Sequence, residues 1–205
     1  AGAAAVTVFD CTCDQMNKAY KTSGVEKAAK DAGAKVVPGD DERYYKETAL
    51  PRGVKLKSTK IHQALIDCDA WFNVPVLKVH RGAKMTIAMK NYLGIVWDRR
   101  IFHKVDLQQC IADVCTWEKK PILNVVDAYR IMKSNGPRGL SQADAVLVKA
   151  LIASTDIVAV DTASTKFAQQ FTNVPLEAVG HIKAGQDLGL GTTNVDSLNV
   201  KRIKV

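Results

Sequence analysis

The chain has 205 residues and a formal net charge of +8, with 47% hydrophobic and 24% charged residues. This composition excludes a disordered chain, and no apolar run approaches the roughly 20 residues that a membrane-spanning helix needs. We therefore expect one soluble domain over residues 1–205, with the cytoplasm as the favoured compartment and export left open.

The N-terminal part of the sequence predicts a strand–helix–strand unit. Apolar, β-branched residues over 4–9 indicate a buried strand, helix formers follow over 15–32, and a second strand is expected over 34–37. Gly24 is expected to divide the helical segment. This order with short links implies a parallel strand pair. Because the first strand begins almost at once, we expect the N-terminal part of a larger fold to be missing.

The rest of the chain continues the alternation. Strands are expected over residues 54–59, 70–76, 122–129, 145–153 and 194–205. Helices are expected over residues 61–65, 85–93, 106–117, 158–171 and 175–188. Polar or glycine-rich stretches indicate loops over 40–53, 95–104 and 130–143. The pattern predicts an α/β fold with a mostly parallel central sheet and helices on both faces.

The positive charge is concentrated in one stretch. Between Lys78 and Lys104 there are seven Lys or Arg residues and one acid, Asp98, so this stretch carries +6 of the net +8. It begins where the strand over 70–76 ends, and in open α/β sheets ligands collect outside the C-terminal ends of strands. A stretch this basic indicates an anionic partner.

Four basic side chains follow that strand directly, namely Lys78, His80, Arg81 and Lys84. Lys78 and His80 are two residues apart, so they project to the same side of an extended segment. The loop after them enters a predicted helix, whose free N–H groups and dipole favour an anion. We interpret these residues as a pocket for a phosphate or a carboxylate. A solvated basic loop is the alternative.

Three residues from the next segments are candidates for the same site. Lys90 shares a helical face with Thr86 and turns either inward or to solvent, and Asn91 adjoins it. His103 is a second imidazole, able to act as a base or metal ligand if its loop folds back over His80. We take His80 and Lys90 as catalytic candidates. The candidate ligand-binding residues are Lys78, Arg81, Lys84, Asn91 and His103.

Carboxylates near the ends of other elements could complete the site. Asp127 follows the strand segment 123–126, and residues 10–14 follow the first strand. Asp156 is a further ligand-binding candidate, although a helix N-cap is its simplest role. Asp161 lies in an apolar helical stretch, where a buried carboxylate needs a partner such as Lys78 or Lys90. We take Asp161 as the third catalytic candidate.

The cysteines and glycines match no standard cofactor motif. The five cysteines include no Cys-x-x-Cys pair, which argues against a disulfide framework, a zinc ribbon or a ferredoxin cluster. We expect buried thiols, with a ligand or redox role for Cys11 and Cys13 as the alternative. No dinucleotide-binding glycine motif or P-loop is present. No metal site is assigned, and the cofactor stays unknown.

Four separated stretches carry a family resemblance. They are DAWFNVPVLKVHRGAKMTIAMKNYLGI, PILNVVDAYRIMKSNGPRG, ALIASTDIVAVDTAS and AGQDLGLGTTN. In this order they resemble the landmarks of domain-of-unknown-function family 362 of bacteria and archaea. The resemblance implies an uncharacterised protein, in a family whose members are often labelled iron-sulfur proteins for a ferredoxin-like cluster beside this domain. This sequence lacks that cluster and the family's opening Lys-Pro-Asn strand. Residues 78–94 are also faintly similar to nickel-pincer lactate racemases.

The sequence therefore predicts a basic strand-end site for a small anionic molecule, with enzymatic activity left open. The alternative is an iron-sulfur or metal-associated redox protein that uses Cys11 and Cys13 with His80 or His103. A nucleic-acid partner is not expected, because the basic stretch lacks the interleaved aromatic residues of a stacking surface.

Overall fold

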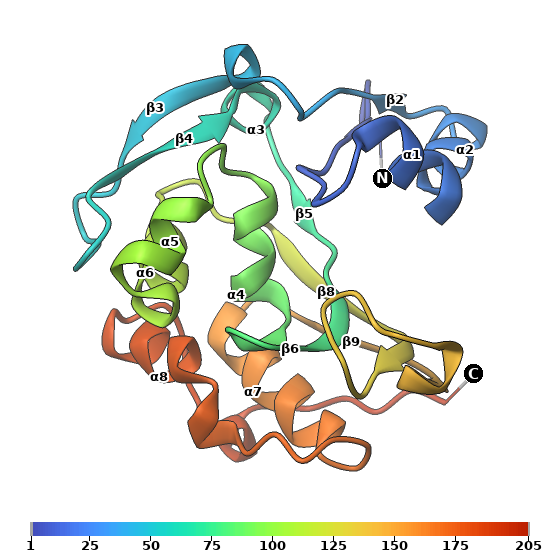
Figure 1. Ribbon diagram of the computed structural model, residues 1–205. Coiled ribbons are helices and arrows are strands. Elements are labelled where there is room, and N and C mark those ends of the chain that lie inside the picture. The colour runs from blue at the N-terminus through green and yellow to red at the C-terminus, as the bar shows by residue number, and fades with distance from the viewer. Residues whose placement is uncertain (1, 205) are drawn as a thin grey trace.

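A mixed sheet lies at the centre of the structure, a computed structural model that describes residues 2–204 (Figure 1). Its strands are β5 (Phe72–Asn73), β6 (Val76–His80), β7 (Lys84–Thr86), β8 (Leu123–Met132) and β9 (Ala145–Ser154). β8 is central: β5 and β6 run parallel to it on one side, β9 runs antiparallel on the other, and β7 pairs antiparallel with β6. Pro75 separates β5 from β6, yet its carbonyl accepts the N–H of Asp127 at 2.8 Å. The ladder therefore continues past the proline.

The α/β class predicted from the sequence is confirmed, with a sheet that is mixed. β8 and β9 form the longest pair, and they are antiparallel because residues 133–144 return the chain directly to the neighbouring position. This connection ends in a 3-10 turn over Gln142–Asp144, in which Ser141 and Asp144 form a capping box. The predicted strand over 145–153 is β9. Residues 130–132, predicted to be loop, extend β8 instead.

A layer of helices covers one face of the sheet. They are α4 (Ala88–Asn91), α5 (Arg100–Val105), α6 (Leu107–Val114), α7 (Ile157–Ala168) and α8 (Gly180–Asp187). α7 contacts β8 and β9, α4 packs on α7, and α6 packs on α8 (Figure 1). The core between the layers includes Leu77, Val126 and Val158, each fully buried. Removal of this apolar surface from water, at about 25 cal/mol per Å², is the main stabilising contribution.

The opposite face of the sheet keeps apolar side chains in solvent. Strand pairing places Val76, Asp127 and Leu151 side by side on this face. Val76 is 46% and Leu151 69% exposed, whereas Val126 on the other face is fully buried. Asp127 therefore points away from the helix layer.

Two smaller strand pairs precede the main sheet. β1 (Thr7–Val8) and β2 (Lys35–Val36) are parallel, as predicted, with α1 (Met16–Ser23) and α2 (Val25–Asp31) between them. Gly24 separates these helices with φ of 78°, a left-handed conformation that glycine adopts readily. β3 (Tyr45–Ala49) pairs antiparallel with β4 (Ser58–His62), and α3 (Gln63–Asp67) follows β4. The prediction of a loop over 40–53 is therefore wrong at β3.

Three more local predictions are wrong. Residues 84–86 form β7 because they fold back onto β6, so α4 begins only at Ala88 and Thr86 is not part of a helix. Residues 100–105 form α5 within a predicted loop. The stretch 194–204 holds a 3-10 turn (Val195–Ser197) in place of an edge strand. Among residues 2–204, no helix combines the length and apolar character that crossing a membrane requires.

Candidate functional site

Three of the predicted residues come together at the C-terminal end of β6. Lys78 and His80 lie in β6, where they pair with Thr86 and Lys84 of β7. Lys90 lies in the last turn of α4. The charges of Lys90 and Lys78 both lower the pKa of His80, so the three side chains are within electrostatic range of one another. We call Lys78, His80 and Lys90 the strand-end cluster.

His80 is held as a neutral hydrogen-bond donor. Its Nδ1 accepts the backbone N–H groups of Gly82 and Ala83 at 3.1 and 3.0 Å. A ring nitrogen that accepts hydrogen bonds carries no proton, so the proton of neutral His80 is on Nε2. Burial first, and then the charge of Lys90, lowers the pKa of His80 to about 4. At neutral pH, His80 therefore offers an N–H group and no charge.

Lys90 is a half-buried lysine among other charged groups. Burial is the largest cause that lowers its pKa, to about 8, and the positive charges of Arg99 and Lys78 act in the same direction. Cys13 and Asp10 oppose this shift. Lys90 is therefore still mostly protonated at pH 7, but its surroundings destabilise the positive charge.

Asp10, at the end of the segment that contains β1, also lies at the cluster. Its Oδ1 is 2.6 Å from the position that a Cβ on Gly94 would take, so the carboxylate fits only because residue 94 is a glycine. Burial raises the pKa of Asp10, while the positive charges of Arg99, Lys78 and Lys90 lower it. The position of Asp10 after a predicted strand was the sequence signal for this role, although no pattern connected it to Lys78.

Arg99 was missed by the sequence analysis. It donates hydrogen bonds to the backbone oxygens of Cys11 and Thr12 at 2.7 and 3.0 Å and to the Sγ of Cys13 at 3.7 Å. These contacts fix the segment 11–13 beside the cluster. Arg99 is one of several cations in a stretch predicted to be loop, so nothing in the sequence distinguished it from its neighbours.

Three predicted ligand-binding residues stay at the surface, namely Arg81, Lys84 and His103. His103 lies on α5 and is close enough to lower the pKa of His80. Lys84 has φ of 67° at the tight return from β6 to β7. Their predicted contacts with a ligand stay a prediction.

Asn91 belongs to a buried amide network. Its Nδ2 donates to the Oδ1 of Asn73 at 2.8 Å, and the Nδ2 of Asn73 donates to Asn124 and to the carbonyl of Ala88, both at 2.9 Å. The network ties α4 to β5 and β8. Asn91 therefore helps to hold Lys90 in place, whether or not it contacts a ligand.

Two of the candidate aspartates lie outside the strand-end cluster. Asp156 is the N-cap of α7 and accepts the N–H of Ala159 at 2.8 Å, which is its simplest predicted role. Asp127 accepts the N–H of Tyr129 at 2.8 Å and points to the open face of the sheet. Among the described residues, neither carboxylate forms an ion pair with Lys78 or Lys90.

Asp161 is fully buried and tied to the start of α4. It accepts the backbone N–H groups of Ala88 and Met89 at 2.8 and 3.0 Å. The first N–H groups of a helix have no acceptor within the helix, so they need such a partner. The predicted pairing of Asp161 with Lys78 or Lys90 is therefore wrong. Burial raises the pKa of Asp161 to about 8, against the effect of the two N–H groups.

His181 on α8 is a second residue that the sequence analysis missed. It is fully buried, and its Nε2 lies 4.0 Å from the Oδ2 of Asp161. Its Nδ1 lies 2.6 Å from the Oε1 of Gln108, which makes Nδ1 the protonated nitrogen. Burial, and after it the charges of Lys90 and His80, lowers the pKa of His181 to about 3. His181 therefore packs behind the cluster as a neutral ring.

The cysteines do not form a metal centre. Cys11, Cys110 and Cys115 are buried, Cys68 is half-buried and Cys13 is exposed, and all are free thiols. Within the part of the chain that the structure describes, no three His, Cys, Asp or Glu side chains are grouped to hold a metal ion.

The fold and the cluster together describe an α/β domain with a cationic site at the end of a strand. A family model described as "Domain of unknown function (DUF362)" matches residues 1–166. Because the match covers most of the chain, this chain belongs to that family. The matched range contains the strand-end cluster and Asp161 and ends before α8. No curated protein and no solved structure matches the chain.

Proposed function

We propose that the strand-end cluster binds a small anion that carries a phosphate or a carboxylate group. The observation that supports this proposal is the meeting of three cations from separate segments. Lys78 comes from β6, Lys90 from α4 and Arg99 from the start of α5, and each acts on the charge of a common neighbour, Asp10. Like charges so close repel one another, and an anion placed among them would relieve that repulsion.

The hydrogen-bonding groups of the cluster suit an anion. Lys90 and Lys78 supply charged donors, and the Nε2–H of His80 supplies a neutral one. The N–H groups of Gly82 and Ala83 are already used by the Nδ1 of His80. The anion would therefore contact side chains of the cluster rather than the backbone of the loop.

Lys90 is the residue best suited to chemistry on a bound anion. An amine with a pKa of about 8 exchanges its proton readily near neutral pH, which favours a general acid or base role. His80 would assist as a hydrogen-bond donor. Asp161 would act as a positioning residue, because it holds the start of the helix that carries Lys90. The reaction itself is left open.

The test is to measure anion binding to Lys90→Met and Lys78→Met by calorimetry, with inorganic phosphate, acetate and succinate as probes. Charge-assisted hydrogen bonds contribute about 1.5–3 kcal/mol, so each change should weaken binding by about 10- to 100-fold. Lys46→Met is the matched control, because Lys46 is exposed on β3. Binding that is equal in all three variants would refute the proposal.

The binding should also depend on pH through Lys90. Lys90 carries its positive charge below a pKa of about 8 and loses it above. Anion affinity should therefore be highest below pH 7 and fall as the pH rises from 7 to 9. Titrations of wild-type protein and Lys90→Met across this range would show it, since the variant should have a much flatter profile.

A redox role through Cys13 is the second candidate. The thiol is exposed and lies 3.7 Å from the Arg99 guanidinium. Elemental analysis of anaerobically purified protein would decide between the two, because the absence of iron, nickel and zinc would remove metal-dependent redox chemistry. A salt-sensitive gel shift with mixed DNA and RNA would indicate a nucleic-acid partner instead.

A further inference from the structure

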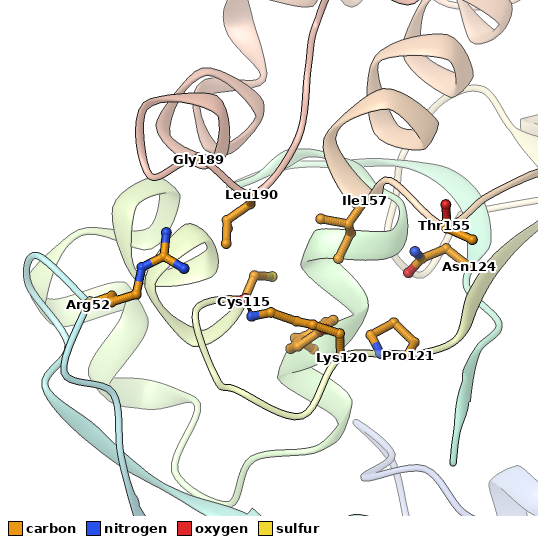
Figure 2. A pocket seen from close by; sticks show the side chains of 10 residues that line it. Arg52, Cys115, Lys120, Pro121, Asn124, Thr155, Ile157, Gly189 and Leu190 are labelled. Carbon is orange, nitrogen blue, oxygen red and sulfur yellow. Dashed lines mark hydrogen bonds between the residues drawn. The ribbon is translucent and has the colours of Figure 1, made fainter. Parts of the chain in front are cut away.

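A separate cavity of about 130 Å³ lies where α7 begins, beside the C-terminal end of β9 (Figure 2). Its walls come from segments far apart in the sequence. They include Arg52 before β4, Lys120 and Pro121 before β8, Ile157 in α7, and Leu190 after α8. No residue of the strand-end cluster lines it. We call this space the α7 cavity.

A buried hydroxyl in the wall of this cavity has no partner. Tyr92 lines the cavity and is 1% exposed, and among residues 2–204 nothing accepts from or donates to its hydroxyl. Burial raises the pKa of Tyr92, so the group stays a neutral O–H donor. A buried hydroxyl without a hydrogen bond destabilises the free protein. The hydroxyl oxygen is closed off from the cavity as well as from solvent, so only other atoms of Tyr92 can contact a molecule placed there.

Two cations meet at the same cavity. Figure 2 shows the guanidinium of Arg52 and the amine of Lys120 directed toward the space beside Cys115. Burial lowers the pKa of Lys120 and the charge of Arg52 lowers it further, although Cys115 opposes the shift. No Asp or Glu is among the described residues that line the cavity. The nearby carboxylate of Asp156 is taken up by α7 and by the N–H of Thr192 at 3.0 Å.

Other parts of the cavity wall are apolar or lie at the start of α7. Ile157, Leu190 and Pro121 give the cavity an apolar side. Ile157 is also the first residue of the 12-residue helix α7, so the positive end of that helix dipole faces the same region. The volume is several times the ~30 Å³ that one water molecule occupies in the liquid, which leaves room for a molecule of a few non-hydrogen atoms.

We propose that the α7 cavity binds a small carboxylate with a short apolar chain. The Arg52 guanidinium and the Lys120 amine recognise the carboxylate. The chain packs against Ile157 and Leu190. This site is independent of the anion site proposed at the strand-end cluster.

Butanoate is the probe, and binding is measured by calorimetry and by tryptophan fluorescence. The indole of Trp71 packs on the Tyr92 ring with centroids 5.3 Å apart, so occupancy should change the emission. Tyr92→Phe removes only the unpartnered hydroxyl. It should leave the fold intact and butanoate binding unchanged, because the hydroxyl is closed off from the cavity. Tyr129→Phe, on the open face of the sheet, is the matched control and should have no effect.

Lys120→Met should weaken binding by at least about 10-fold. Lys120 also donates to the backbone oxygens of Cys115 and Trp117, so its replacement removes two hydrogen bonds within the fold as well. Leu190→Phe provides a second variant, because the larger ring fills the cavity and should abolish binding. The strand-end cluster is also proposed to take carboxylates, so the cavity variants are compared in the Lys90→Met background, where the remaining butanoate binding reports on the α7 cavity.

Three results would overturn the proposal. One is an absence of butanoate binding at about 10 mM, a concentration far above the Kd of a specific site. Another is equal binding of butan-1-ol, which would show an apolar void without charge recognition. The third is unchanged affinity in both Lys120→Met and Leu190→Phe.

Discussion

Asp113 on α6 and Asp161 on α7 are both fully buried, and their surroundings differ in the number of hydrogen bonds that they receive. Asp113 accepts four: from the backbone N–H groups of residues 54, 55 and 56 at 2.7–2.9 Å and from the side chain of Gln109 at 2.8 Å. Asp161 accepts two, from Ala88 and Met89. A buried carboxylate stays ionised when enough donors replace the water that it has lost.

Both aspartates join distant segments, but with different consequences. Asp113 holds the chain that enters β4 against α6 and accepts four hydrogen bonds while doing so. Asp161 holds the start of α4 against α7, and two N–H groups are too few to offset burial, which raises its pKa to about 8. A buried aspartate near a candidate site, such as Asp161, can therefore be a positioning residue. Its shifted pKa alone does not make it catalytic.

The largest expected effect is that of Asp113→Asn. The amide has one acceptor oxygen, and its NH₂ group would face N–H donors, so at least two buried donors lose their partner. We expect the free energy of unfolding to fall by about 3 kcal/mol at pH 7. Urea denaturation measures it. Asp161→Asn should cost about 1 kcal/mol or less, because Asp161 is already mostly neutral at that pH. Equal losses in the two variants would contradict the comparison.

The next effect is on the pH dependence of stability. The folded-state pKa of Asp161, about 8, lies above its unfolded value of about 3.9, so the folded state keeps a proton that the unfolded state releases. Stability from this group is therefore lost as the pH rises from about 4 to 8. His181, with a folded pKa of about 3, has the opposite slope between about 3 and 6.5.

The two slopes cancel between about pH 4 and 6.5, and above pH 6.5 only the slope of Asp161 remains. From pH 6.5 to 8 the loss should be about 2 kcal/mol, at about 1.4 kcal/mol per pH unit. The measurement is the difference in unfolding free energy between wild type and Asp161→Asn, which removes the contributions of all other groups. A difference that does not change over this range would show that Asp161 is ionised throughout.

The smallest effect is expected at Ser164, which lies on α7 one turn after Asp161. Its hydroxyl is fully buried, and residues 2–204 offer it no hydrogen-bond partner. Ser164→Ala should therefore stabilise the protein by up to about 1 kcal/mol, since it removes an unpaired polar group and adds helix propensity. Thr165→Val is the control, because the Thr165 hydroxyl donates to the Asp161 carbonyl at 2.8 Å. Thermal unfolding should show opposite shifts in the two variants.

Several features of the fold follow from local sequence signals. Apolar runs of strand length predicted β9, the amphipathic pattern predicted α6, and Gly24 marked the division between α1 and α2. Asp156 was correctly predicted as an N-cap, because capping depends on residues within a few positions. In contrast, residues 84–86 have the composition of a helix and become a strand, since pairing with β6 outweighs local propensity.

The sequence by itself determined the α/β class, the family and the concentration of positive charge after β6, because these depend on composition, periodicity and the order of motifs. Only the tertiary structure decided which charges meet. Asp10 and Arg99 lie 89 positions apart in the sequence and both act on Lys90, while Asp127 turns to the opposite face. The tertiary structure also decided that Asp161 pairs with backbone N–H groups. Electrostatic and hydrogen-bonding partners depend on distances in space, which the order of residues along the chain does not specify.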